Sequence, residues 1–219
     1  MWYNDLRPNG ELIPNKYALT FIKEFDGDQI LTEADKKRTL NNLISLKQGL
    51  KEKIPRKKVD DNILLCTWNI KEFGHLKKRL PESYYYMAEI ISAFDIVAIQ
   101  EIKSNLKGLN YVMRLLGSNW SYIMSDITEG TSGNKERFGY IYDTRRVKLS
   151  GLSGELVISP EIAETSVIKQ LKRTPSITGF ESGWKNSQLL ICIRNLVINQ
   201  KFLQILQIHL LYLGAQIMI

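Results

Sequence analysis

The feature that most constrains the fold is an alternation of short apolar runs with segments of helical periodicity, beginning at Asn62. Short apolar runs bounded by turn residues indicate strands, and apolar residues spaced three or four apart indicate amphipathic helices. The predicted strands are NILLCTWNI (62–70), DIVAIQEI (95–102) and WSYIMSD (120–126), and the predicted helices are PESYYYMAEIISAF (81–94) and LKGLNYVMRLLG (106–117). Such an alternation is typical of an α/β domain with helices packed on its sheet.

Beyond residue 136 the pattern changes to consecutive strands. RFGYIYD (137–143) and VKLSGLSGELVI (147–158) are joined at Thr-Arg-Arg, which we interpret as the turn of a β-hairpin. PSITGFES (175–182) and FLQILQIHLLYL (202–213) predict further strands. The sequence therefore predicts a layered α/β domain rather than a purely parallel one.

Residues 1–58 differ from the rest and predict an N-terminal extension with one helix, ahead of a main domain over 59–219. Thr32 and Asp35 form a variant of the capping box, and leucines and isoleucines at helical spacing predict one amphipathic helix from Glu33 to Glu52. Pro55 ends it. We expect Leu40, Leu43 and Leu50 to pack this helix onto the domain, and the basic stretch PRKKVDD (55–61) to be a solvated connector.

Composition constrains the function only loosely. The chain has 219 residues and a net charge of +7, which suits a polyanionic partner but is also common in ordinary soluble proteins. Cys66 and Cys192 lie in apolar stretches, so we expect two small core residues rather than a disulfide. The chain has neither the pattern of a signal peptide nor an apolar run long enough to span a bilayer, so we expect no membrane association and a cytoplasmic location.

Two of the predicted strands end in polar residues where a core would favour valine or leucine. Asn69 ends the first, and Glu101 ends the next. The ends of parallel strands form the edge at which open α/β sheets bind ligands. A carboxylate there suits Mg²⁺, which takes one or two protein carboxylates and keeps its other positions for water and phosphate. The alternative is that Glu101 starts a loop and Asn69 stabilises a turn.

Five segments occur in an order and spacing that resembles the endonuclease/exonuclease/phosphatase family, of the deoxyribonuclease I-like type. They are CTWNIKEFG, DIVAIQEIK, SDITEGTSGNKERFGYIYDTRRVKLSG, RTPSITGF and LQIHLLYLG. The resemblance covers residues 62 to about 184 and, more loosely, the stretch around His209. It implies a four-layer α/β/β/α sandwich in which two sheets pack face to face with helices outside.

The resemblance also implies roles for individual residues. Glu101 would hold Mg²⁺ or Mn²⁺ and Asn69 would lie in the same active site. Glu136 would support His209 in proton exchange, which needs a carboxylate to fix the imidazole tautomer. Arg173 and Arg137 would contact substrate phosphate, a role suited to the guanidinium group.

Each of these residues has a structural alternative. A glutamate in a loop is often a solvated charge, a histidine on an apolar strand is often a core residue, and an arginine at a sheet edge often forms a salt bridge. The tyrosine cluster Tyr84–Tyr86 could stack on bases, but we favour packing, because a helix presents only part of such a cluster to one partner.

The chain departs from the family pattern in its last part. After the predicted strand that carries His209 it has neither the family's Asp-x-Asn motif nor its Ser-Asp-His motif, and its only histidines are His75 and His209. We therefore expect a truncated, incomplete domain. The segment 183–214 is longer than the family's and reads as an insertion or the product of a disturbed reading frame. An uncovered apolar sheet face would follow, through which the chain could self-associate.

The sequence thus predicts a metal-dependent phosphodiester hydrolase, a nuclease that acts on DNA, with its activity in question because half of the site is missing. Two alternatives remain. One is a catalytically inactive remnant that binds nucleic acid or a protein, and the other is a phosphatase or phospholipid phosphodiesterase of the same family.

Overall fold

The structure is a computed structural model that describes residue 6 and residues 31–59, 61–74, 79–126, 136–155 and 175–182 with their side chains, and the backbone of 187–193 and 216–218. The helices are α2 (Glu33–Lys53), α3 (Glu82–Ser92) and α4 (Lys107–Leu116). The strands are β1 (Leu64–Phe73), β2 (Ile96–Ile102), β3 (Trp120–Met124), β4 (Arg137–Asp143), β5 (Val147–Glu155), β6 (Ser176–Ser182), β7 (Ser187–Ile193) and β8 (Gln216–Met218).

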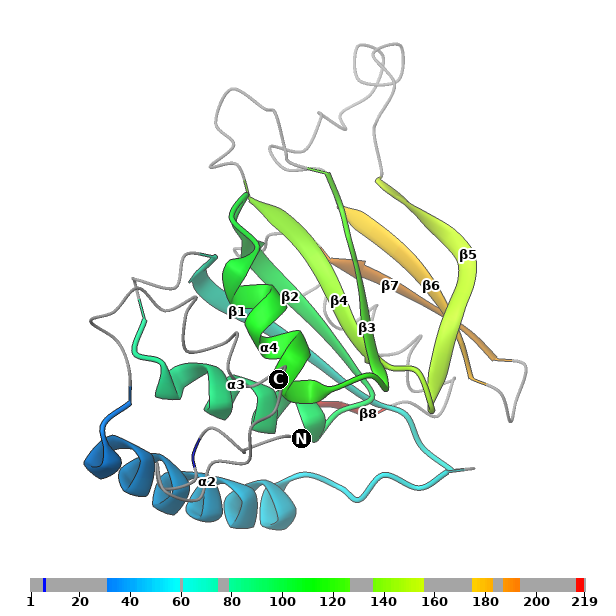
Figure 1. Ribbon diagram of the computed structural model, residues 1–219. Coiled ribbons are helices and arrows are strands. Elements are labelled where there is room, and N and C mark those ends of the chain that lie inside the picture. The colour runs from blue at the N-terminus through cyan, green and yellow to red at the C-terminus, as the bar shows by residue number, and fades with distance from the viewer. Residues whose placement is uncertain are drawn as a thin grey trace.

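The strands form two sheets (Figure 1). The larger has the order β3-β4-β2-β1-β8, in which β2 and β8 run parallel to β1 while β4 runs antiparallel to β2 and β3. The smaller is the antiparallel sheet β5-β6-β7. Helix α3 makes the crossover between the parallel strands β1 and β2, as the alternation of strand and helix predicts. The α/β class is confirmed.

Both faces of the larger sheet are buried. Along β2, Val97 and Ile99 belong to the core beneath the helices, whereas Ile96 and Ala98 belong to the core shared with Phe180 of the smaller sheet. Successive side chains of a strand point to opposite faces, so a strand covered on both sides needs an uninterrupted apolar sequence. This explains why residues 96–99, within DIVAIQEI, form a continuous apolar run.

The described elements therefore make three layers, with helices on one face of the larger sheet and the smaller sheet on the other (Figure 1). Among the described residues no helix covers the outer face of the smaller sheet, so a fourth layer stays a prediction. The smaller sheet packs on one face of the larger sheet. The uncovered apolar sheet face, and self-association through it, also stay predictions.

The predicted hairpin of 137–143 and 147–158 is wrong. Strands β4 and β5 follow each other closely but lie in different sheets, and each pairs with other strands. The turn between them is fixed at both ends, because Thr144 donates its backbone N–H to the carbonyl of Asn119 at 2.9 Å and Arg146 donates to the carbonyl of Asp143 at 2.9 Å. A short turn therefore carries the chain from one sheet to the other.

Helix α2 begins and ends close to the predicted limits. The Thr32 side chain accepts the N–H of Asp35 at 3.1 Å, and the Asp35 carboxylate accepts the N–H of Thr32 at 3.0 Å, so the capping box is confirmed. Leu43 is buried in the core, but Leu40 faces solvent, and this part of the packing prediction is wrong. Helix α2 instead adds polar contacts to α3, including a hydrogen bond from Arg38 to Glu82 at 2.6 Å.

The connector after α2 is not simply solvated. Lys57 is three-quarters buried, and its ammonium group donates to the carbonyl of Phe94 at 2.6 Å. The same group lies 3.4 Å from the carboxylate of Asp95 and 3.9 Å from that of Asp143. Lys57 forms ion pairs inside the fold because two buried acidic side chains lie beside it.

The other predictions about the fold have different outcomes. Tyr84 and Tyr85 are buried, and Tyr111 packs against both rings, which confirms the packing interpretation. Residues 187–193 of the segment that reads as an insertion form β7 and pair with β6. The predicted strand 202–213 lies outside the described residues. No helix in the described ranges is long and apolar enough to cross a membrane.

Candidate active site

Asn69 and Glu101 lie near each other in the larger sheet, on neighbouring parallel strands. The prediction that Asn69 ends its strand is wrong, because β1 continues through the irregular pairing that follows and ends at Phe73. Asn69 of β1 pairs in register with Gln100 of β2, so Asn69 and Glu101 lie on neighbouring strands at the same edge. The Asn69 side-chain amide donates to the carboxylate of Glu101 at 3.0 Å. The structure therefore brings these two predicted site residues into contact.

An irregularity in the strand pairing holds the Glu101 carboxylate in place. The register between β1 and β2 shifts between the pairs Asn69–Gln100 and Phe73–Ile102, so residues 70–72 of β1 lie opposite Glu101 alone. Within this bulge the backbone N–H of Glu72 donates to the second carboxylate oxygen of Glu101 at 3.2 Å. Each carboxylate oxygen thus accepts one hydrogen bond from β1, which fixes the orientation of the group.

Both glutamates of the bulge have left-handed backbone conformations. The φ angle is 51° at Glu72 and 64° at Glu101, and no other non-glycine residue in the described part of the chain has a positive φ. Such a conformation costs about 1–3 kcal/mol for a residue with a side chain, and it persists where the surrounding structure enforces it. Strained residues of this kind cluster at functional sites, so the bulge marks this sheet edge as a candidate site.

A glycine allows the chain to pass close behind the bulge. A Cβ atom at Gly74 would lie 2.7 Å from the Cβ of Lys103 and 2.9 Å from the carbonyl oxygen of Asn105, which is too close for any side chain. The Gly74 carbonyl also accepts the N–H of Gly108 at 2.8 Å. The end of β1 is thereby tied to the start of α4.

An ion pair forms just beyond the end of β2. The ammonium group of Lys103 lies 2.8 Å from the carboxylate of Glu136, whose side chain is only 11 % exposed. Arg137 donates to the backbone carbonyl of Lys103 at 3.4 Å. Two predicted site residues, Glu136 and Arg137, are thus both bonded to Lys103, which comes two residues after Glu101 in the chain.

Sequence reasoning did not single out Lys103. It lies just past the end of β2 and two residues after Glu101, whose left-handed backbone interrupts the regular alternation of a strand, so the sequence carries no clear signal that Lys103 contacts Glu136. The other two predicted site residues, Arg173 and His209, lie outside the described residues. The pairing of Glu136 with His209 therefore stays a prediction.

The donor set at this edge fits a hard divalent cation only in part. The carboxylate of Glu101 provides the oxygen ligands that Mg²⁺ prefers, in a fixed orientation. Within the described residues no group of three or more His, Cys, Asp or Glu side chains is arranged to hold a metal ion. A cation here would therefore bind one described carboxylate and complete its shell with water, substrate or residues outside the described ranges.

Thiol chemistry at this edge is disfavoured. Burial raises the pKa of the Cys66 thiol on β1 to about 11, so the thiol stays protonated at neutral pH. A protonated thiol is a poor nucleophile and a poor metal ligand. Cys66 therefore behaves as the small core residue that the sequence predicts.

The comparisons with known proteins give similar structures but no sequence match. No family model and no curated protein matches the chain. A mannosyl-6-phosphatase from Bacteroides thetaiotaomicron is similar with a TM-score of 0.43 and 15 % identity, over 71 % of this chain and 62 % of that one.

Two further structures carry the family name itself. An endonuclease/exonuclease/phosphatase family protein from Bacteroides thetaiotaomicron gives a TM-score of 0.42 and 16 % identity, over 60 % of this chain and 46 % of that one. An endonuclease/exonuclease/phosphatase from Bacteroides vulgatus gives 0.40 and 13 %, over 60 % and 50 %. The chain thus spans about half to three-fifths of the structures it matches. Solved structures similar to this α/β chain are members of the endonuclease/exonuclease/phosphatase family, which its sequence motifs resemble.

Proposed function

We propose that this chain derives from a phosphoester hydrolase of the endonuclease/exonuclease/phosphatase type, and that its site cleaves phosphodiester bonds of DNA with Mg²⁺ or Mn²⁺. The observation that carries the proposal is the carboxylate of Glu101, oriented by Asn69 and by the N–H of Glu72 within a strained bulge. The family motifs place the same residue types at the same points of the sequence.

The residues of the proposed site have different roles. Glu101 would hold the cation, which when bound supplies Lewis-acid stabilisation of charge on the phosphate. Asn69 would keep the Glu101 carboxylate in one orientation, and its side-chain amide would face the side of the sheet at which the substrate is proposed to bind. Arg137 and Arg173 would contact phosphate oxygens with their guanidinium groups. Glu136 would orient His209, which would exchange a proton with water or the leaving oxygen.

Two features support DNA as the substrate. The chain has a net charge of +7, and a basic protein attracts a polyanion. The NKER segment that contains Glu136 and Arg137 is similar to the deoxyribonuclease branch of the family. We take residues 59–219 as the unit that carries this site, with α2 packed against it.

A second candidate is an inactive relative that binds nucleic acid or a protein partner. It is supported by the arrangement of the described residues, in which no three His, Cys, Asp or Glu side chains come together to hold a cation around Glu101. A phosphatase or phospholipid phosphodiesterase of the same family is the third candidate, since the residues around Glu101 would serve any phosphoester.

The test is nicking of a supercoiled plasmid by the purified chain with Mg²⁺ or Mn²⁺, against EDTA. We expect metal-dependent nicking that Glu101→Gln abolishes and Asn69→Ala reduces by about tenfold or more, because each removes or misorients the proposed ligand. Glu52→Gln, at an exposed position on α2, is the matched control and should leave the rate unchanged.

The outcomes separate the three candidates. Nicking that survives Glu101→Gln, in a protein whose melting temperature is unchanged, would overturn the site assignment. A folded protein that binds DNA without nicking it would favour the inactive relative. Hydrolysis of nitrophenyl phosphate but not of bis-nitrophenyl phosphate would favour the phosphatase.

A further inference from the structure

A pocket lies between α2 and α3, away from the candidate active site. Its volume is about 410 Å³, and its wall comes from the C-terminal half of α2, the residues that follow α2, and the end of α3. Helix α3 leads into the amino-terminal end of β2, whereas Glu101 lies near the carboxyl-terminal end of that strand. The five steps along the strand from Ile96 to Glu101 span about 17 Å, so the two places are distinct.

The pocket combines an apolar surface with a cationic rim. Leu50, Ile54 and Ala93 contribute the apolar part, and Lys47, Lys51 and Arg56 contribute positive charge. Glu89 also lines the pocket, and its carboxylate lies 3.8 Å from the ammonium group of Lys47.

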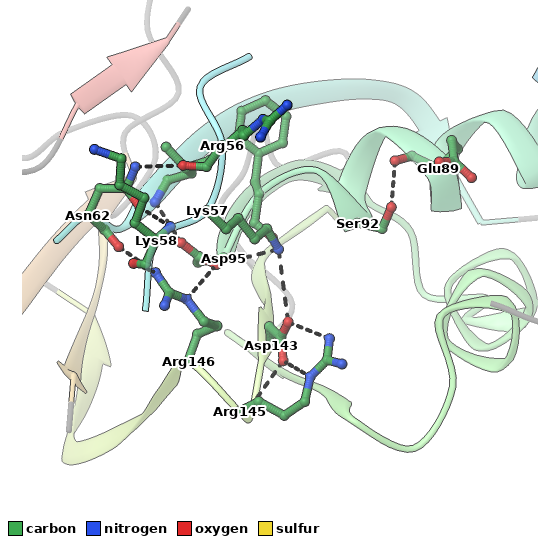
Figure 2. A network of polar contacts seen from close by, with 12 residues as sticks. Arg56, Lys57, Lys58, Asn62, Glu89, Ser92, Asp95, Asp143, Arg145 and Arg146 are labelled. Atoms are coloured by element: carbon green, nitrogen blue, oxygen red, sulfur yellow. Dashed lines mark hydrogen bonds and ion pairs between the residues drawn. The ribbon is translucent and has the colours of Figure 1, made fainter. Parts of the chain in front are cut away.

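The cations at the rim of the pocket differ in whether they form ion pairs with described residues of the protein. Figure 2 shows Lys57, which also lines the pocket, joined to Asp95 and Asp143. Lys51 and Arg56 are exposed, and within the fully described part of the chain neither side chain forms an ion pair. Among the described residues these two cations therefore have no counter-charge of their own, unlike Lys47 and Lys57.

We propose that this pocket binds a small organic anion whose apolar body packs on Leu50, Ile54 and Ala93 and whose anionic group meets Lys51 and Arg56. The volume lies within the range of small-molecule sites, and the lining has their usual character, mostly apolar with a few polar groups that orient the ligand. An inorganic anion would leave the apolar surface of the pocket exposed to water, and a neutral apolar molecule would make no ionic contact with Lys51 and Arg56. The proposal does not depend on hydrolysis at Glu101.

The test uses two fluorescent probes that share a ring system, applied to the full chain. Anilinonaphthalene sulfonate carries the anionic group, and phenylnaphthylamine lacks it. We expect saturable binding of the sulfonate and weaker binding of the neutral probe. Lys51→Glu and Arg56→Glu should each weaken the sulfonate about tenfold or more, the usual effect of losing a charge-assisted contact, and leave the neutral probe unchanged.

Two further variants complete the design. Lys53→Glu is the matched control, because Lys53 is an exposed lysine in the same last turn of α2 but does not line the pocket. It should leave the affinity of the sulfonate within about twofold of the original, since distant exposed charges are screened. Ala93→Leu fills the apolar part and should weaken both probes, with near-ultraviolet circular dichroism confirming the native fold.

The proposal is overturned if the sulfonate binds no tighter than the neutral probe. It is also overturned if Lys53→Glu weakens the sulfonate as much as Lys51→Glu, because binding would then depend on net charge alone. Unchanged binding of both probes to a folded Ala93→Leu variant would place the probes elsewhere on the protein.

Discussion

Lys57 places its ammonium nitrogen 3.4 Å from the carboxylate of Asp95, which is completely buried. The contact joins the segment after α2 to the start of β2 (Figure 2). The same carboxylate accepts the guanidinium N–H of Arg146 at 3.1 Å and the backbone N–H of Leu64 at 2.8 Å. One carboxylate thus connects four parts of the chain: the α2 connector, β1, β2 and the turn before β5.

The first prediction concerns this carboxylate. Asp95→Asn should lower the free energy of unfolding by about 3 kcal/mol, because it removes the buried counter-charge of Arg146 and the nearer of the two buried counter-charges of Lys57. Urea unfolding at neutral pH measures the change. Asp61→Asn is the control, since Asp61 pairs with Lys58 on the exposed surface and should have no measurable effect. Equal losses in the two variants would contradict the buried role.

The second prediction concerns pH. Burial alone would raise the pKa of Asp143, but hydrogen bonds from Arg145 and the nearby charge of Lys57 outweigh it, so this pKa lies below its ordinary value. The folded state therefore favours the ionised carboxylate. Its contribution to stability is complete above the unfolded pKa of about 4 and is lost as pH falls through the folded pKa.

Urea midpoints measured between neutral pH and about pH 3 check this effect. We expect the midpoint of the original chain to fall more steeply on acidification than that of Asp143→Asn, which cannot titrate at this position. Parallel curves for the two proteins would show that Asp143 does not link folding to pH.

The third prediction separates backbone strain from side-chain chemistry at the bulge. Glu72→Asn and Glu72→Val both remove the carboxylate, but asparagine tolerates a left-handed backbone and valine does not. With φ at 51°, the valine variant should be less stable than the asparagine variant by about 2 kcal/mol. Thermal unfolding compares them, and equal melting temperatures would mean that the backbone relaxes out of the left-handed region.

The fourth prediction compares two neighbouring residues of α2. Leu43 is buried and Ile44 is 66 % exposed. Leu43→Ala should cost about 3 kcal/mol, because it leaves a cavity in the core, whereas Ile44→Ala should stay within about 0.5 kcal/mol. Chemical denaturation of the two variants checks this. If Leu43→Ala were as stable as the original chain, α2 would not belong to the core.

The sequence predicted those parts of the fold that local rules determine. The capping box at Thr32 and the crossover through α3 follow from neighbouring residues, and the contact of Asn69 with Glu101 follows from the rule that parallel strands end at one edge. The left-handed backbone at Glu101 could not be read from the sequence, because glutamate is not a residue that favours it. Tertiary pairing imposes it.

Two errors have the same origin. The sequence of a turn between consecutive strands looks the same whether the two strands pair with each other or enter different sheets. The placement of β5 therefore could not be predicted without knowledge of its partner β6. Similarly, Lys57 looks like any surface lysine until Asp95 and Asp143 come from distant parts of the chain to meet it. In both cases the deciding contacts are far apart in sequence.

The turn from β4 to β5 has a mechanical consequence. The turn is held by contacts with Asn119 and Asp95, so the corner at which the two sheets join is stiff. A stiff corner restricts the relative movement of the two sheets close to it and allows larger displacements of the sheets farther away. The opposite end of β4 begins at Arg137, which follows Glu136 in the chain. The largest relative movement of the two sheets would therefore occur at the end of β4 that carries two of the residues proposed for the active site.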